Sequence, residues 1–297
     1  MNAMQISEYL KSRNRPLLSF EFFPPKDDAG MDALKIASAK LLSAKPDFVT
    51  VTYGAGGSTR QKTLDICDML KVMGFASVMP HLTCVGHTRA ELVDVSEEIH
   101  HRGFRNIMTL RGDPPKGETV YRPPKDGLAH ASDLVTLIKS RHPDICCGVA
   151  GYPEKHPEAK SLNEDIEHLK AKIAAGGSFI TTQLFFENRH YFDFVHKCRN
   201  AGIHQPIIPG LMPALSYKQI NRFVSTCGAN VPTALSSALE KAGDDAEAAS
   251  AIGIQWVVRQ IDDLLQNGVP GIHLYILNRA KVALAPAVTE CFARYRA

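Results

Sequence analysis

The feature that most constrains the fold is a regular alternation of two kinds of segment. Short runs rich in β-branched and aromatic residues, typical of buried strands, recur about eight times, and helix-length stretches separate them. Several of these helices have a start signal, in which Thr88, Ser161 or Ser216 precedes Glu or Gln by three residues. The expected strands are 17–23, 48–54, 77–84, 106–113, 146–153, 178–186, 206–213 and 271–277.

Strands that are each followed by a helix require right-handed crossovers and therefore a parallel sheet. Eight such units close naturally into a ring, and we predict an α/β fold of the (β/α)8 TIM-barrel type. An open, doubly wound sheet is the alternative. The stretch between 213 and 271 is too long for one helix, so we expect an extra helix before the last strand. No linker interrupts the pattern, and residues 1–297 are expected to form a single catalytic barrel domain.

Charge and composition limit the class of partner. Lys and Arg number 34 against 31 Asp and Glu, a net charge of +3 that is spread along the chain, so we expect no nucleic-acid partner. No run approaches the ~20 apolar residues of a membrane span, and the first residues lack a signal-peptide pattern. We therefore expect a cytoplasmic protein with no membrane partner. The seven cysteines have no C-x-x-C spacing and are expected to be reduced and mostly buried.

Polar side chains follow nearly every expected strand, at the end where the loops of a barrel build its site. Glu21 is the sharpest signal, because a carboxylate between Phe20, Phe22 and Phe23 would be desolvated, which raises its pKa and suits it to proton transfer. A buried glutamate paired with an arginine is the structural alternative. The other polar candidates are Thr52, Tyr53, His81, Arg111, Gly112, Asp113, Tyr152, His156, Glu158, Gln183, Asn278 and Arg279.

Several other kinds of site do not match the sequence. The loop at 54–57 lacks the glycine spacing of a dinucleotide-binding turn, and neither a Walker A lysine nor a G-x-S-x-G elbow occurs. A metal site that began at His156 and Glu158 would have no second histidine cluster to complete it, so we expect no catalytic metal. The later strands contain no lysine for Schiff-base chemistry.

Eight ordered blocks over about residues 17–280 resemble methylenetetrahydrofolate reductase, namely SFEFFPPK, VTYGAGGSTR, PHLTC, LRGDPP, GYPEKHPEAKS, TTQLFF, IIPGLMP and LNRA. The fold of that family is a (β/α)8 barrel with FAD across its C-terminal mouth. The resemblance implies reduction of 5,10-methylenetetrahydrofolate to 5-methyltetrahydrofolate by a ping-pong route. NADH or NADPH first gives hydride to FAD and leaves, and the folate then takes that hydride. The resemblance also implies a homo-oligomer without a regulatory domain, so we expect no inhibition by adenosylmethionine.

The resemblance assigns roles to individual residues. It implies that Glu21 is the general acid that protonates the folate, so that the one-carbon bridge opens to an iminium ion. It implies that the charge of Asp113 tunes the flavin and stabilises that cation. The implied folate contacts, besides Glu21, are Gln183, Gln219, Phe223, Leu277 and Arg279. The implied cofactor contacts are Thr52, Tyr53, His81, Leu110, Arg111, Gly112, Asp113, His130, Ala131, Tyr152, His156, Glu158, Ala159, Asp165, His168 and Lys172.

Three positions depart from the family pattern. His130 stands where a tyrosine is common, and His168 and Ala171 replace polar or basic side chains that help to hold FAD. Because an arginine contact with a phosphate contributes about 1–3 kcal/mol, we expect partial loss of FAD during purification. Two other functions stay open. One is a flavin- or folate-binding barrel that needs a partner to deliver electrons, and the other is a metal-dependent barrel lyase.

Overall fold

The computed structural model describes residues 4–12, 14–54, 60–114, 117–118 and 120–296, so most of the glycine loop at 54–57 lies outside the described residues. Its centre is a sheet of nine parallel strands in the order β7-β6-β5-β4-β3-β2-β1-β9-β8. The strands are β1 (Leu17–Phe22), β2 (Phe48–Val51), β3 (Val78–Thr83), β4 (Asn106–Leu110), β5 (Cys146–Gly151), β6 (Gly177–Thr182), β7 (Ile207–Ile208), β8 (Gly210–Leu211) and β9 (Gly271–Tyr275).

The sheet closes into a ring through one interrupted strand. β7 and β8 are two pieces of the segment expected at 206–213, separated by Pro209, which has no N–H for a strand ladder. β7 pairs with β6 and β8 pairs with β9, so this segment joins both edges of the sheet. The ring confirms the predicted (β/α)8 barrel and excludes the open, doubly wound sheet.

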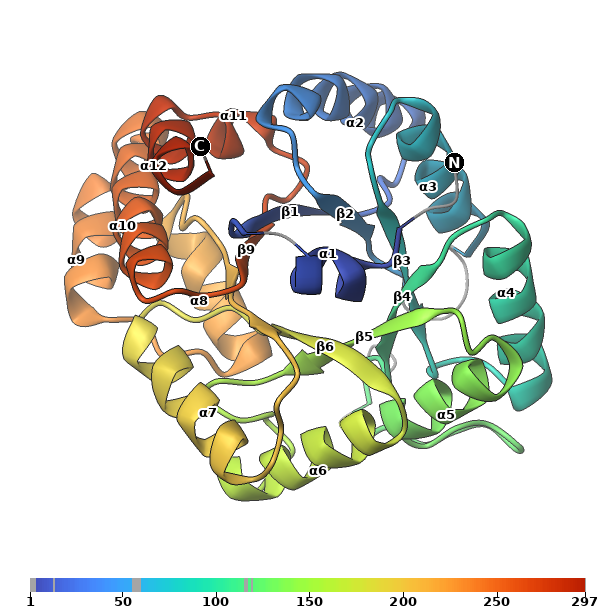
Figure 1. Cartoon of the computed structure of the whole chain (residues 1–297). Helices are drawn as coiled ribbons and strands as arrows, with labels where there is room; N and C mark the ends of the chain where they lie inside the picture. Colours follow the sequence, from blue (N-terminus) through green and yellow to red (C-terminus); the bar gives the residue numbers. More distant parts are fainter. Residues whose placement is uncertain (1–3, 13, 55–59, 115–116, 119, 297) are drawn as a thin grey trace.

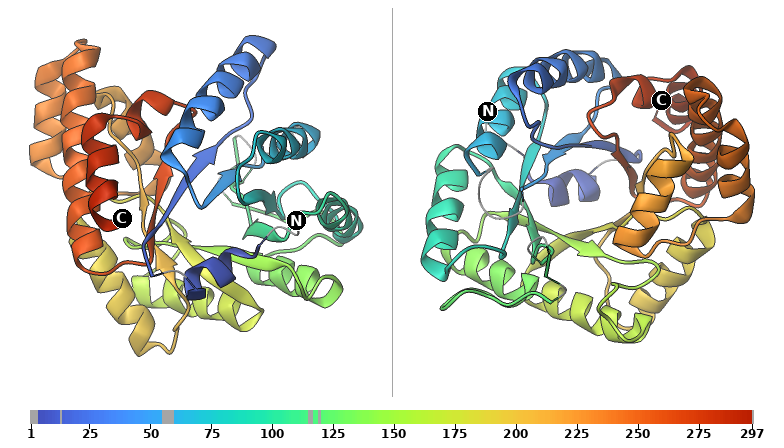
Figure 2. Two further views of the ribbon diagram at one scale, coloured as in Figure 1. Left: turned by 45° about the horizontal axis from the view of Figure 1, so that its top comes forward. Right: turned by 180° about the vertical axis from the view of Figure 1, so that it is seen from behind.

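Helices surround the ring on its outside (Figures 1 and 2). Those that return the chain between successive strands are α2 (Asp28–Leu41), α3 (Arg60–Val72), α4 (Arg89–His101), α5 (Ala131–Arg141), α6 (Leu162–Ala174) and α7 (Asn188–Asn200). A short 3-10 helix, η1 (Leu42–Ala44), follows α2. The capping box expected at Thr88 is confirmed, because its hydroxyl accepts from the Glu91 N–H and the Glu91 carboxylate accepts from the Thr88 N–H.

The interval before the last strand holds three helices, so the prediction of an extra helix there is confirmed and exceeded. They are α8 (Tyr217–Cys227), α9 (Thr233–Ala242) and α10 (Ala246–Gln266). Leu184, Phe186, Met212 and Leu235 belong to a separate apolar cluster beneath them. Two further helices, α11 (Ala280–Ala283) and α12 (Pro286–Arg296), follow β9.

The N-terminal helix α1 (Ile6–Ser12) closes one end of the barrel and lies at the centre of the ring in Figure 1. Ile6 and Tyr9 pack against Phe48 and Phe179, which face the barrel interior. The Ile6 N–H donates to Asn106 Oδ1 at 2.7 Å, at the start of β4. Among the described residues, apolar side chains fill this end of the barrel, which favours a ligand site at the carboxyl ends of the strands.

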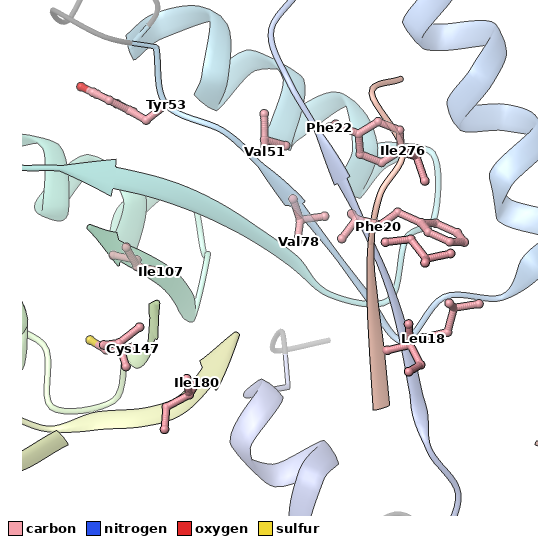
Figure 3. Close-up of a cluster of buried hydrophobic side chains, with 14 of the residues drawn as sticks. Leu18, Phe20, Phe22, Val51, Tyr53, Val78, Ile107, Cys147, Ile180 and Ile276 are labelled. Atoms are coloured by element: carbon pink, nitrogen blue, oxygen red, sulfur yellow. The ribbon is translucent and has the colours of Figure 1, made fainter. Parts of the chain in front are cut away.

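The outer faces of the strands form the larger core. Every second residue of β1 packs outward with Ile276, namely Leu18, Phe20 and Phe22 (Figure 3). Successive residues of a strand face opposite sides of the sheet, so Ser19 and Glu21 point into the barrel instead.

Two expectations about composition can be compared with the structure. Six of the seven cysteines are buried and Cys227 is half-buried, and all of them are free thiols, as predicted. Across the described part of the chain, no helix is long and apolar enough to cross a membrane.

Candidate functional site

A cavity of about 440 Å³ lies at the C-terminal mouth of the barrel, at the end opposite α1. Residues from the ends of β1 to β6, β8 and β9 line it, and α8 covers one side. Loops from different strands therefore bring distant parts of the sequence together here, as barrel folds generally do. The predicted site residues that line this cavity are Glu21, Thr52, Tyr53, His81, Leu110, Arg111, Gly112, Asp113, Tyr152, His156, Gln183, Phe223 and Leu277.

Glu21 lies on the inner face of β1 with its side chain 21% exposed, and it faces the cavity. Its Oε2 is 3.6 Å from His81 Nε2 and 3.7 Å from His273 Nε2. The other ring nitrogen of His273, Nδ1, is 2.8 Å from the Ser19 hydroxyl, which fixes the orientation of that imidazole. Within the described residues the ion-pair partners of Glu21 are these two histidines, so the alternative of a buried glutamate–arginine pair is wrong.

The expected surroundings of Glu21 need a correction. Phe20 and Phe22 are fully buried, but they belong to the outer core, on the other face of β1. Phe23 is exposed. Neighbours in the sequence of a strand are not neighbours on one face of it, so the aromatic rings cannot enclose the carboxyl. Two imidazoles enclose it instead.

His81, one of the two histidines beside Glu21, is uncharged near neutral pH. Burial lowers the pKa of His81 to about 4 and outweighs the opposite effect of the Glu21 carboxylate. At 3.6 Å the His81 Nε2 lies beyond hydrogen-bond distance of the Glu21 carboxylate, and a neutral imidazole brings no full positive charge to it. Tyr275 completes this part of the wall; its hydroxyl donates to the Thr182 carbonyl at 2.6 Å, and burial raises its pKa well above the usual value.

A cationic group lines the cavity after the end of β4. The Arg111 guanidinium binds both carboxylate oxygens of Glu158, at 2.6 and 2.7 Å, and lies 5.5 Å from the Tyr121 ring. The hydrogen bond to Glu158 raises the pKa of Arg111. Glu158 itself does not line the cavity, and its observed role is to orient Arg111.

Lys172 is half-buried on α6 and does not line the cavity. Its Nζ donates to the Ala150 carbonyl at 2.6 Å and lies 6.0 Å from the Tyr152 ring. Burial lowers the pKa of Lys172 to about 8, while the Asp165 carboxylate opposes that shift. Asp165 is itself buried and accepts a hydrogen bond from the His156 N–H at 3.0 Å, which ties α6 to the loop after β5.

The remaining predicted contacts lie around the cavity without lining it. His130 precedes α5 and its carbonyl accepts from Cys84 Sγ, while Gln219 accepts from the Leu215 N–H at the start of α8. His168 is exposed on α6, and Arg279 is exposed before α11. Their roles as ligand contacts stay predictions. The complete set of predicted residues outside the lining is His130, Ala131, Glu158, Ala159, Asp165, His168, Lys172, Gln219, Asn278 and Arg279.

Sequence reasoning missed several residues of this site. His273 and Tyr275 alternate along β9, and this period of two places both side chains inside the barrel, so the pattern GIHLY could have revealed them. Thr181 lines the cavity, and its buried hydroxyl has no hydrogen-bond partner among the described residues. The other lining residues that were not predicted are Thr83, Val85, Met108, Ala150, Leu184, Met212 and Cys227.

Comparison with known proteins supports one family. A family model described as methylenetetrahydrofolate reductase matches residues 5–289. The chain is 38% identical over 268 residues to the 5,10-methylenetetrahydrofolate reductase of Escherichia coli, covering 90% of this chain and 88% of that protein. It is 37% identical over 294 residues to methylenetetrahydrofolate reductase (NADH) 1 of Arabidopsis thaliana, covering 95% of this chain. The chain spans about half the length of this plant relative, 50%.

Solved structures agree on the fold. An uncharacterised protein from Clostridium thermocellum, described as binding two copies of 5-methyl-5,6,7,8-tetrahydrofolic acid, superposes with a TM-score of 0.65 at 17% identity, over 96% of this chain and 99% of that one. A 2,3-dimethylmalate lyase superposes with a TM-score of 0.53 at 10% identity, over 96% of this chain and 81% of that one. At such identities the likeness shows the fold alone. The match of the family model over residues 5–289, with the E. coli relative aligned along most of both proteins, shows that this chain belongs to the methylenetetrahydrofolate reductase family.

Proposed function

We propose that this chain reduces 5,10-methylenetetrahydrofolate to 5-methyltetrahydrofolate by a ping-pong route, with FAD as cofactor and NADH or NADPH as electron donor. One observation supports it above the others: a carboxyl group, Glu21, faces the mouth cavity beside an uncharged imidazole, at 3.6 Å from His81. This arrangement places a carboxyl group, which can act as a proton donor, on the wall of the cavity. The Arabidopsis relative is named for NADH, which makes NADH the first donor to test.

The residues around the cavity fit a flavin nucleotide. The unpartnered hydroxyl of Thr181 offers a hydrogen bond to a ligand. Gly112 has a φ of +89°, and a Cβ there would come within 2.9 Å of Val85, so only glycine lets the loop after β4 pack this closely at the cavity. Arg111 is the cation on the wall, and we expect Lys172 to add positive charge toward the phosphates. When bound, FAD supplies reversible hydride transfer.

The chain's own residues then account for the proton and the charge. Glu21 holds a proton at its carboxyl and gives it to a folate nitrogen, which opens the one-carbon bridge. Asp113 is exposed at the rim of the cavity, where a negative charge stabilises the iminium cation. Gln183, Phe223 and Leu277 line the side formed by β6, α8 and the end of β9, and we expect them to position the folate.

The test is an anaerobic experiment on FAD-loaded protein in two steps. Addition of NADH or NADPH is expected to bleach the visible absorbance of the flavin, and methylenetetrahydrofolate is then expected to restore it. Colour that persists with both nucleotides would favour the alternative, a binding barrel that needs a partner to deliver electrons. Loss of activity with chelators would instead favour the metal-dependent lyase. The homo-oligomer and the cytoplasmic location stay predictions.

A further inference from the structure

A second cluster of ligand-type side chains lies at the opposite end of the barrel, near α1. It consists of His100, in the last turn of α4, and of His142 and Asp144, in the loop between α5 and β5. One possible ligand atom from each residue lies within 4.8 Å of those of the other two. The side-chain amide of Gln5 donates to the main-chain carbonyl of Asp144 at 2.7 Å, which links this loop to the start of α1.

His142 is the fixed member of the cluster. The residue is 6% exposed, and its Nε2 is a buried nitrogen without a hydrogen-bond partner among the described residues. Glu97 Oε2 lies 3.4 Å from it, outside hydrogen-bond geometry. A buried polar atom without a partner requires an explanation, and a ligand is one.

The two other residues have room to adjust. The His100 side chain is 28% exposed, and its ring stacks on that of His142 with centroids 4.3 Å apart. Its Nε2 lies 3.1 Å from Asp144 Oδ2, and the Asp144 side chain is half-exposed. Stacked rings do not point their nitrogens at one ion, so coordination requires His100 to rotate out of the stack.

Two arginines orient the carboxylates of Glu97 and Asp144. Arg141 binds Oε1 of Glu97 at 2.7 Å and leaves Oε2 on the side of His142. Arg105 Nε lies 3.1 Å from Asp144 Oδ2. Hydrogen bonds of this kind fix the geometry of ligand carboxylates in metal sites.

We propose that His100, His142 and Asp144 form a binding site for a divalent transition-metal ion of the zinc class, with Glu97 Oε2 or a water at the fourth position. Two imidazoles and a carboxylate are a donor set that Zn²⁺ accepts in tetrahedral geometry, at about 2.0–2.2 Å from each ligand. Three such donors stand roughly 3.4 Å apart around one ion. The Asp144 carboxylate stays oriented by Arg105, and rotation of the partly exposed His100 side chain out of the ring stack closes the present spacing. The ion ties the end of α4 to the loop before β5 and takes no part in hydride transfer.

The test uses the full chain after dialysis against a chelator. Titration with Co²⁺ is expected to give the intense visible bands of a tetrahedral ion at one ion per chain, and Zn²⁺ is expected to displace it. His100→Ala and Asp144→Asn are each expected to weaken Co²⁺ binding about tenfold or more. Both side chains are partly exposed, so these variants avoid the folding risk of a change at His142. The matched control is His204→Ala, an exposed histidine between α7 and β7, which is expected to leave the titration unchanged.

Three results would each overturn the proposal: substoichiometric binding, a weak octahedral spectrum, or equal affinity in His100→Ala and the unaltered protein. Bleaching of the flavin by NADH is measured on the same samples. Because the cluster and the mouth cavity lie at opposite ends of the barrel, loss of the metal site leaves that reaction unchanged. A failure here is therefore distinguishable from a failure of the proposed reductase function.

Discussion

Glu21 is the residue whose substitution separates the two halves of the proposed reaction. Glu21→Gln keeps the shape of the side chain but removes the acidic proton, which only folate reduction requires. We expect flavin reduction by the nicotinamide to stay within about twofold, and folate reduction to slow by about 10²–10⁴-fold. Anaerobic stopped-flow measurement of each half-reaction decides the point. Equal losses in both halves would show that Glu21 acts in binding and not as the acid.

Asp113 tests the electrostatic part of the proposal. Its exposed carboxylate at the rim should disfavour added negative charge on the flavin, and Asp113→Asn removes that effect. An electrostatic contribution of about 1 kcal/mol corresponds to about 20 mV for a two-electron couple, so the midpoint potential should rise by that order. Asp94→Asn, an exposed acid on α4, changes the net charge equally and is the control for spectroelectrochemical titration. A potential that is the same in both variants would contradict the role of Asp113.

Lys172 makes the affinity for FAD depend on pH. Because the pKa of Lys172 is lowered to about 8, the side chain is a cation below that pH and neutral above it. A phosphate binds the cationic form better, so affinity should be highest below pH 8 and fall as pH rises through this value. The loss should reach about tenfold, as for one charge-assisted hydrogen bond. Fluorescence titration of the apoprotein with FAD measures it, and Lys172→Met should bind weakly with a flat profile. A pH-dependent fall that persists in this variant would assign the titration to another group.

At the scale of an element, helix α10 packs directly on the chain that leaves β8. A Cβ at Gly253 would overlap the carbonyl oxygen of Ala214. In an exposed helix, Gly→Ala usually stabilises by about 1 kcal/mol, but here we expect Gly253→Ala to lower the free energy of unfolding by about 1–3 kcal/mol. Gln255→Ala, at an exposed position of the same helix, is the control in urea unfolding. Met212 lines the cavity close to Ala214, so weaker flavin binding should accompany the change. Stabilisation by Gly253→Ala would mean that α10 can shift away from Ala214 at little cost in free energy.

The starts of the strands were predictable to within one residue because apolar runs with turn signals on either side are local features of the sequence. Apart from the ends of β1 and β3, their ends were placed two to four residues too late, because the sequence run continues, as at Asp113 and Gln183, after the backbone has left the sheet. The partners of Glu21 were missed for a similar reason. His273 reaches Glu21 because β9 pairs with β1, and His81 reaches it from β3, beyond β2 in the sheet. His142 lies 42 positions after His100 in the chain.

At the scale of the whole molecule, one buried carboxylate joins the two ends of the chain. Asp47 precedes β2 and its side chain is 1% exposed. Its carboxylate accepts hydrogen bonds from Arg15 at 2.8 Å and from the Leu18 N–H, near the start of β1, at 2.9 Å. It also accepts one from Arg296, at the end of α12, at 2.9 Å. The last helix is thereby fastened to the first strands, at the seam where β9 and β1 close the ring.

Asp47→Asn keeps the shape of this side chain but removes the charge that both guanidinium groups share. Removing one partner from a buried ion pair costs about 3–5 kcal/mol, so the midpoint of urea unfolding should fall substantially with an unchanged slope. Asp32→Asn disrupts an exposed pair with Lys35 on α2 and should cost less than about 0.5 kcal/mol. A double-mutant cycle with Arg296→Gln isolates the contribution of α12. If Asp47→Asn matched the Asp32→Asn control, closure of the barrel would depend on apolar packing alone and not on this charge.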